Sequence, residues 1–95
     1  MGMIIRREMT ITHDDFSRLL PTTLADYHFK IAGHSIRVKM QSGSVEIQLM
    51  PETKRKIGAL FVPVTHLTFQ FINTAQDEMQ LFSNKFNHAY HKGGG

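Results

Sequence analysis

The sequence predicts an α+β fold, in which a mainly antiparallel sheet of four or five strands carries two helices packed on one face. Apolar and polar residues alternate between Tyr27 and Ile72, which is the pattern of strands with one buried face. Before and after this block, apolar residues recur every three or four positions, as on the buried stripe of a helix. Because strands and helices bury side chains at different spacings, the change of period marks the boundaries between sheet and helices.

The chain begins with an edge strand and a short helix. Residues 4–11 mix charged and apolar side chains in loose alternation, which is typical of an edge strand protected by charge. Thr12 and Asp15 form a variant of the capping box, so a helix begins there, and Pro21 disfavours its continuation. The apolar face of this helix consists of Phe16, Leu19 and Leu20.

Three strands of a meander follow the first helix. Alternating segments at 27–31, 36–40 and 45–49 are separated by short polar turns that contain Gly33 and Gly43. Short turns of this kind join antiparallel neighbours, so these segments are predicted to pair in sequence order.

The last part of the chain predicts a long strand and a second helix. Residues 51–56 are highly charged and indicate a connection, whereas residues 57–72 are strand-like almost throughout. Pro63 interrupts this stretch, so we expect a bend, a bulge or a junction between two strands there. The second helix runs to about His91, and the glycines at 93–95 end it. Its core-facing residues are Met79, Phe82 and Phe86.

These segments form one domain over residues 1–92, followed by a flexible glycine tail at 93–95. Their order fits a split β-α-β or a TATA-binding-protein-like two-layer arrangement, with the order of the strands left open. The sheet residues expected to line the core on one face are Phe29, Ile31, Ile36, Val38, Val45, Ile47, Leu67, Phe69 and Phe71.

Composition limits the setting in which the protein works. The 95 residues include no cysteine, which excludes disulfides and cysteine-based zinc sites, and the start lacks an apolar run long enough for a signal peptide. No segment approaches the ~20 apolar residues of a membrane span, so we expect a soluble cytoplasmic protein without membrane contact. Eleven Lys and Arg against eight Asp and Glu give a net charge of +3, a weak preference for anionic partners.

Catalytic and cofactor motifs do not stand out in the sequence. It has neither the G-x-S-x-G surroundings of a serine nucleophile nor a glycine-rich phosphate loop. We therefore name no catalytic residue and no cofactor, and we expect a protein that is not an enzyme. A small acid–base enzyme whose catalytic groups lie far apart in the sequence is the alternative.

Two histidines offer a candidate metal site. His88 and His91 are three residues apart on the predicted second helix, a spacing that lets two imidazoles share one transition metal. A dedicated site needs three or four ligands, and no carboxylate or cysteine lies beside this pair in the sequence. Solvated surface histidines are the alternative interpretation.

Basic residues offer a candidate surface for nucleic acid or another anion. The alternation that turns apolar strand residues inward turns basic residues outward, where with a second basic run they can form one patch that attracts phosphates. The candidate residues are Lys30, Arg37, Lys39, Lys54, Arg55 and Lys56. The strand aromatics all fall on the core side, where they cannot stack on bases, so an ordinary solvated face is the alternative.

Taken together, these observations favour a small non-enzymatic binding or accessory domain. It would act on another protein, or on a second copy of itself in a dimer, through an exposed sheet edge or face. The alternatives are a nucleic-acid-binding domain that uses the basic sheet face and, with less support, a weak histidine-based metal-binding protein.

Overall fold

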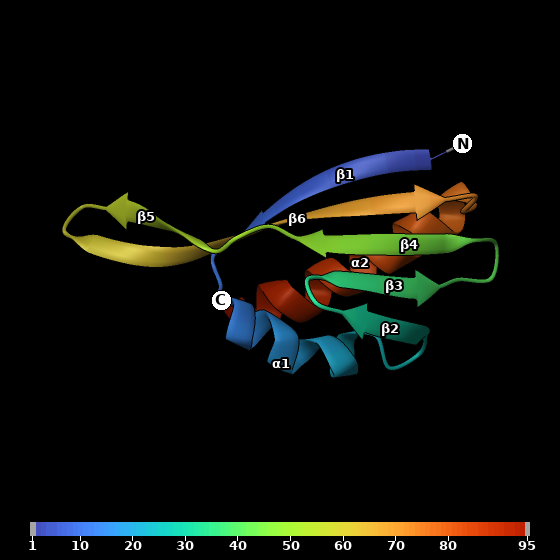
Figure 1. Cartoon of the computed structure of the whole chain (residues 1–95), viewed down its shortest axis with the longest axis horizontal. Helices are drawn as coiled ribbons and strands as arrows, with labels where there is room; N and C mark the ends of the chain where they lie inside the picture. The colour runs from blue at the N-terminus through green and yellow to red at the C-terminus, as the bar shows by residue number, and fades with distance from the viewer. Residues whose placement is uncertain (1, 95) are drawn as a thin grey trace.

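Two layers make up the structure, a sheet of antiparallel strands and a pair of helices that covers one of its faces (Figure 1). The computed structural model of the chain describes residues 2–94, with side chains from residue 3 to residue 90. The elements are β1 Gly2–Met9, α1 His13–Thr23, β2 His28–Ala32, β3 Ser35–Lys39, β4 Ser44–Leu49, β5 Thr53–Ile57, β6 Leu60–Ile72 and α2 Gln76–Gly94. The α+β class predicted from the sequence is confirmed, with six strands instead of four or five.

The main path of the sheet has the order β1-β6-β4-β3-β2, and every pair of neighbours is antiparallel. β1 and β2 lie at opposite edges, so α1, which connects them, crosses the covered face of the sheet. The predicted meander β2-β3-β4 is present. β6 then inserts between β4 and β1, which places the last strand of the chain inside the sheet.

The strand registers bring the predicted core residues onto one face. Val38, Val45 and Phe71 lie beside one another in neighbouring strands, for example, and all three are buried. Phe29 is half-buried at the edge of this core, and Ile31 is 55% exposed. The prediction that Ile31 lines the core is wrong, because β2 is an edge strand and Ile31 lies near its end, beside the hairpin turn.

Both helices contribute apolar side chains to the same core. The buried helix residues are Phe16 and Leu20 in α1 and Phe82, Phe86 and Tyr90 in α2, with Leu19 and Met79 packed against them. The rings of Phe69 and Phe86 lie 4.8 Å apart at an angle of 77°, the edge-to-face geometry that aromatic pairs favour. Within residues 2–94, neither helix combines the length and the apolar content needed to cross a bilayer.

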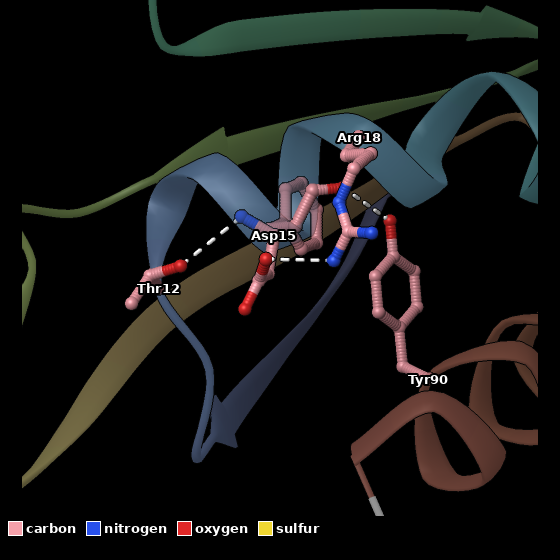
Figure 2. Close-up of polar contacts among 5 residues, drawn as sticks. Thr12, Asp15, Arg18 and Tyr90 are labelled. Atoms are coloured by element: carbon pink, nitrogen blue, oxygen red, sulfur yellow. Dashed lines mark hydrogen bonds and ion pairs between the residues drawn. The ribbon is translucent and has the colours of Figure 1, made fainter.

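The two ends of α1 differ in how well the sequence predicts them. The Thr12 hydroxyl accepts a hydrogen bond from the Asp15 amide at 3.1 Å, so the predicted cap is confirmed (Figure 2). At the other end, the helix continues two residues past Pro21, contrary to the prediction. Leu24 directly follows the helix, is buried, and donates its amide to the Leu20 carbonyl at 2.9 Å. The extra turn therefore buries a further apolar side chain, which offsets the hydrogen bond lost at proline.

α2 is joined to α1 near its C-terminal end. The Tyr90 hydroxyl donates a hydrogen bond to the Phe16 carbonyl at 2.9 Å (Figure 2), and burial raises the pKa of Tyr90. α2 extends beyond the predicted end near His91. Of the glycine run expected beyond the helix, Gly93 and Gly94 belong to α2, and Gly95 lies outside the described residues.

A hairpin extends beyond the two layers (Figure 1). Residues 51–56, predicted as a connection, contain most of strand β5, which pairs with residues 60–64 of β6. β6 runs unbroken through Pro63, and what changes there is its partner, from β5 to β1 and β4. Because residues 60–64 have a strand on one side only, a residue without an N–H is tolerated among them. We call the hairpin of residues 53–64 the arm.

Candidate functional site

The arm projects from one end of the sheet (Figure 1). Five cross-strand pairs, from Thr53 with Val64 to Ile57 with Leu60, hold it together. A two-residue turn closes its tip, and Gly58 has a φ of +61°, which glycine adopts without steric cost. Residues 51–61 are all exposed, so neither face of the outer arm is covered by another element.

Hydrogen bonds fix the root of the arm to the body. Thr65 is buried, and its hydroxyl donates to the Ile11 carbonyl at 2.8 Å. The Glu52 carboxylate accepts from the His13 amide at 2.7 Å, and Nε2 of the same histidine lies 2.9 Å from the Met50 carbonyl oxygen. The body therefore sets the direction in which the arm points.

The tip of the arm carries a cluster of exposed apolar side chains. Ile57 is 56% exposed, Leu60 69% and Phe61 64%. Ile57 and Leu60 are cross-strand partners, and Phe61 follows Leu60 on the opposite side of the ribbon. Large apolar side chains that are exposed on both sides of one narrow tip indicate a surface that a partner encloses, whereas single ones are ordinary. The sequence predicts a strand here but not its isolation, because isolation depends on which strands lie beside it.

Three of the six candidate basic residues lie on the arm. Lys54 and Lys56 share one side of β5, and neither has an acidic partner in the described part of the chain. Arg55 points to the other side and forms an ion pair with Glu8 of β1. The tip is therefore apolar with a positively charged flank.

The other three candidate basic residues lie on the open face of the sheet, which the helices do not cover. Lys30 and Arg37 are cross-strand partners on β2 and β3, and Lys39 lies two positions farther along β3. Arg37 is paired with Glu46 at 3.2 Å. Because the arm pairs with β6 alone, the six candidates form two separate groups and not one patch.

A groove opens at the end of the sheet opposite the arm. It has a volume of about 800 Å³ and lies between the α1–β2 connection, the β3–β4 turn and the first turns of α2. Its apolar lining includes Tyr27, Met40 and Leu81, of which Leu81 is 53% exposed. The sequence does not predict this groove, because the three segments that form it are far apart along the chain.

Glu78 holds the wall of the groove that the β3–β4 turn forms. Its carboxylate accepts hydrogen bonds from the Ser42 hydroxyl and from the amides of Ser42 at 2.9 Å and Gln41 at 2.8 Å. These hydrogen bonds lower the pKa of Glu78, and the bond from the Ser42 hydroxyl has the largest effect. A Cβ at Gly43 would lie 2.6 Å from the Asn73 carbonyl oxygen, so the turn is packed tightly against the end of β6. The β3–β4 turn is therefore a fixed wall of the groove.

The charged lining of the groove is more acidic than basic. Asp26 and Lys85 form an ion pair at 3.2 Å, which cancels one charge of each sign. The remaining charged side chains are Asp77 and Glu78 against Lys39.

The candidate metal ligands are not brought together with a third ligand among the described side chains. His88 is exposed on α2, and the side chain of His91 lies outside the described residues. Where side chains are described, no group of three His, Cys, Asp or Glu has the arrangement that a metal ion requires. The rings of His13 and His34 lie 5.6 Å apart, a pair that the sequence does not predict. Metal binding at His88 and His91 stays a prediction.

Comparisons with protein-family models, with curated proteins and with solved structures gave no match to this chain. The split β-α-β or TATA-binding-protein-like arrangement therefore stays a prediction, while the α+β class is shown by the elements themselves. Three surfaces of the molecule are candidates for binding: the arm, the open face of the sheet and the groove.

Proposed function

We propose that this chain is a small binding domain that docks onto another protein through the arm. The observation that carries the proposal is the exposed cluster of Ile57, Leu60 and Phe61 at the tip of a projecting hairpin. An isolated two-stranded hairpin is at best marginally stable in water, because it has no apolar face to bury. A partner that encloses the tip supplies the missing contact.

The composition of the tip suits burial in a protein interface. Each large apolar side chain gains about 1.5–3 kcal/mol when it is removed completely from water. Phe61 occupies the place of an aromatic anchor, and Lys54 and Lys56 occupy that of a polar rim. The free strand edges of the arm also offer backbone groups to a partner strand. We therefore expect a partner with an apolar pocket and an acidic rim.

Site-specific photo-crosslinking tests this proposal. A photoreactive amino acid replaces Phe61 at the tip or Ile31, an apolar residue of similar exposure near the turn of β2, as the matched control. We expect a protein partner to crosslink from position 61 and not from position 31. Binding of the purified partner should then weaken at least tenfold in the double variant Leu60→Ser, Phe61→Ser and stay unchanged in Ile31→Ser. Equal binding by the folded double variant would contradict the proposal.

A second candidate function, binding of double-stranded nucleic acid, is favoured by the charges of the open face. Both acidic residues that the strands carry, Glu8 and Glu46, are paired with arginines. Arg6, Lys30 and Lys39 point to the same side and have no acidic partner within the described residues. The unpaired charge of this face is therefore positive, which favours a polyanion.

Fluorescence anisotropy with a labelled DNA duplex tests the second candidate. We expect binding at low salt that weakens steeply as salt rises, because phosphate contacts release counterions. Charge reversal at Lys30 and Lys39 should abolish this binding, whereas reversal at Lys54 and Lys56 on the arm should leave most of it. Absence of binding at low salt would reject this function.

A further inference from the structure

We propose that the arm docks in the groove of a second copy of this chain, so that two copies form a symmetric dimer with two such contacts. This inference rests on the proposed function of the arm and names its partner as the chain itself. Three properties of the arm and the groove support this inference: their positions, their apolar surfaces and their charges.

The arm lies at one end of the molecule, and the β3–β4 turn and the start of α2, which line the groove, lie at the other (Figure 1). The arm contains the first five residues of β6, whereas the groove borders the turn beside Ile72, its last residue. β6 has 13 residues, so at roughly 3.3 Å per residue about 40 Å separates its ends. The arm therefore cannot reach the groove of its own chain. Two antiparallel copies place each arm beside the groove of the other, as twofold symmetry requires.

The groove provides the apolar contact that the tip lacks. Tyr27, Met40 and Leu81 form an apolar lining, and the side chain of Leu81 remains accessible to a partner. The tip is narrow, because only Gly58 and Ala59 extend beyond its last cross-strand pair. A volume of about 800 Å³ lies in the range of pockets that enclose several apolar groups. The tip therefore fits the groove in size and polarity.

Complementary charges orient the tip in the groove. The Lys85 ammonium is engaged by Asp26 at 3.2 Å and by an aromatic ring whose centre lies 5.5 Å away. Asp77 lines the groove from the first turn of α2 and has no cationic partner among the described side chains. Lys54 and Lys56 lack an acidic partner in the same way. Lys39 also lines the groove, and Asp77 and Glu78 outnumber it, so docking brings Lys54 and Lys56 to a lining whose remaining charge is negative.

Sedimentation equilibrium of the full chain tests the dimer by a charge swap. We expect the wild-type chain to dimerise reversibly. An arm variant, Lys54→Glu with Lys56→Glu, and a groove variant, Asp77→Lys, should each raise the dissociation constant at least tenfold. An equal mixture of the two variants should form a heterodimer with an affinity near that of the wild type. One of its two contacts then has both charges reversed, and the other is unchanged.

Lys30→Glu on the open face is the control for charge reversal, because it reverses the charge of one lysine away from the arm and the groove. This variant should dimerise like the wild type, and circular dichroism should show that all variants are folded. A wild-type chain that stays monomeric at millimolar concentration overturns the inference. A dimer that neither reversal weakens, or a mixture that does not recover, overturns it as well.

Photo-crosslinking from position 61 separates this inference from the proposed function. Crosslinks to residues 75–85 of a second copy support both. A chain that stays monomeric but crosslinks from position 61 to a different protein overturns the inference and supports the arm as a docking element. Crosslinks to nucleic acid alone, or no crosslink and no effect of the tip variants, overturn both.

Discussion

Two hairpins of the sheet, β2–β3 and the arm, share a local design and differ in their surroundings. The β2–β3 hairpin and the arm each join their strands through two residues, and each turn opens with a glycine at φ +61°, Gly33 or Gly58. β3 nevertheless alternates between buried and exposed residues, whereas every residue of β5 is exposed. Turn chemistry thus specifies a hairpin, and only its neighbours in the fold decide whether it stabilises the domain or stays available for binding.

The largest difference in the free energy of unfolding is expected between alanine variants of two phenylalanines in the same strand. Phe69 is buried among the rings of α2, so Phe69→Ala should lower the free energy of unfolding by about 3–5 kcal/mol. Phe61 lies on the exposed tip, so Phe61→Ala should change it by less than about 0.5 kcal/mol. Urea unfolding followed by circular dichroism measures both. Similar losses would show that the arm belongs to the cooperative core.

A second comparison sets two glycines against each other. Gly43→Ala drives a Cβ into backbone carbonyl oxygens that cannot move aside, so a loss of about 3 kcal/mol is expected. Gly58→Ala meets no atom within 4 Å and should cost only about 1–2 kcal/mol, from the positive φ. Urea unfolding of the two variants checks the order. A greater loss at Gly58 than at Gly43 would mean that the arm, and not the β3–β4 turn, limits stability.

Tyr90 extends the comparison to the junction of the two helices, far from the arm. Tyr90→Phe removes the hydrogen bond to the Phe16 carbonyl and should cost about 1 kcal/mol. Burial raises the pKa of Tyr90 in the folded state. The contribution of Tyr90 to the free energy of unfolding is therefore fully present below the ordinary tyrosine pKa of about 10 and declines as pH rises above that value. Unfolding titrations between neutral pH and pH 11 should show this decline in the wild type and in Tyr27→Phe. An equally steep decline in Tyr90→Phe would contradict it.

The smallest change in the free energy of unfolding is expected for a variant of Glu78, at the wall of the groove. Hydrogen bonds from Ser42 and Gln41 lower the pKa of Glu78, so its stabilising effect is present above the ordinary carboxyl value and is lost as pH falls. Glu78→Gln should cost less than about 1 kcal/mol at neutral pH, because solvent screens much of this interaction. The wild type should lose its advantage over the variant as pH falls below the ordinary carboxyl value of about 4.5. A difference that stays constant below that value would show that the carboxylate charge does not hold the turn.

The body could be predicted from the sequence because alternation records burial on one face. Phe69 and Phe71 lie where their spacing places them, and Thr12 caps the helix that it was expected to cap. The arm breaks this rule, because a strand with no covered face needs no alternation, and residues 51–56 therefore resemble a connection. The groove escaped prediction for another reason, since Tyr27 and Asp77 meet only through the fold.

β6 belongs to both regions, and its continuity has a mechanical consequence. The same strand forms one side of the arm and lies between β1 and β4 in the sheet, with Pro63 stiffening the passage between them. The arm is therefore a rigid extension of the sheet and not a flexible linker. A partner bound to the tip is therefore held at a fixed angle to the domain. A force applied to the tip is transmitted along the backbone of β6 to its hydrogen bonds with β1 and β4.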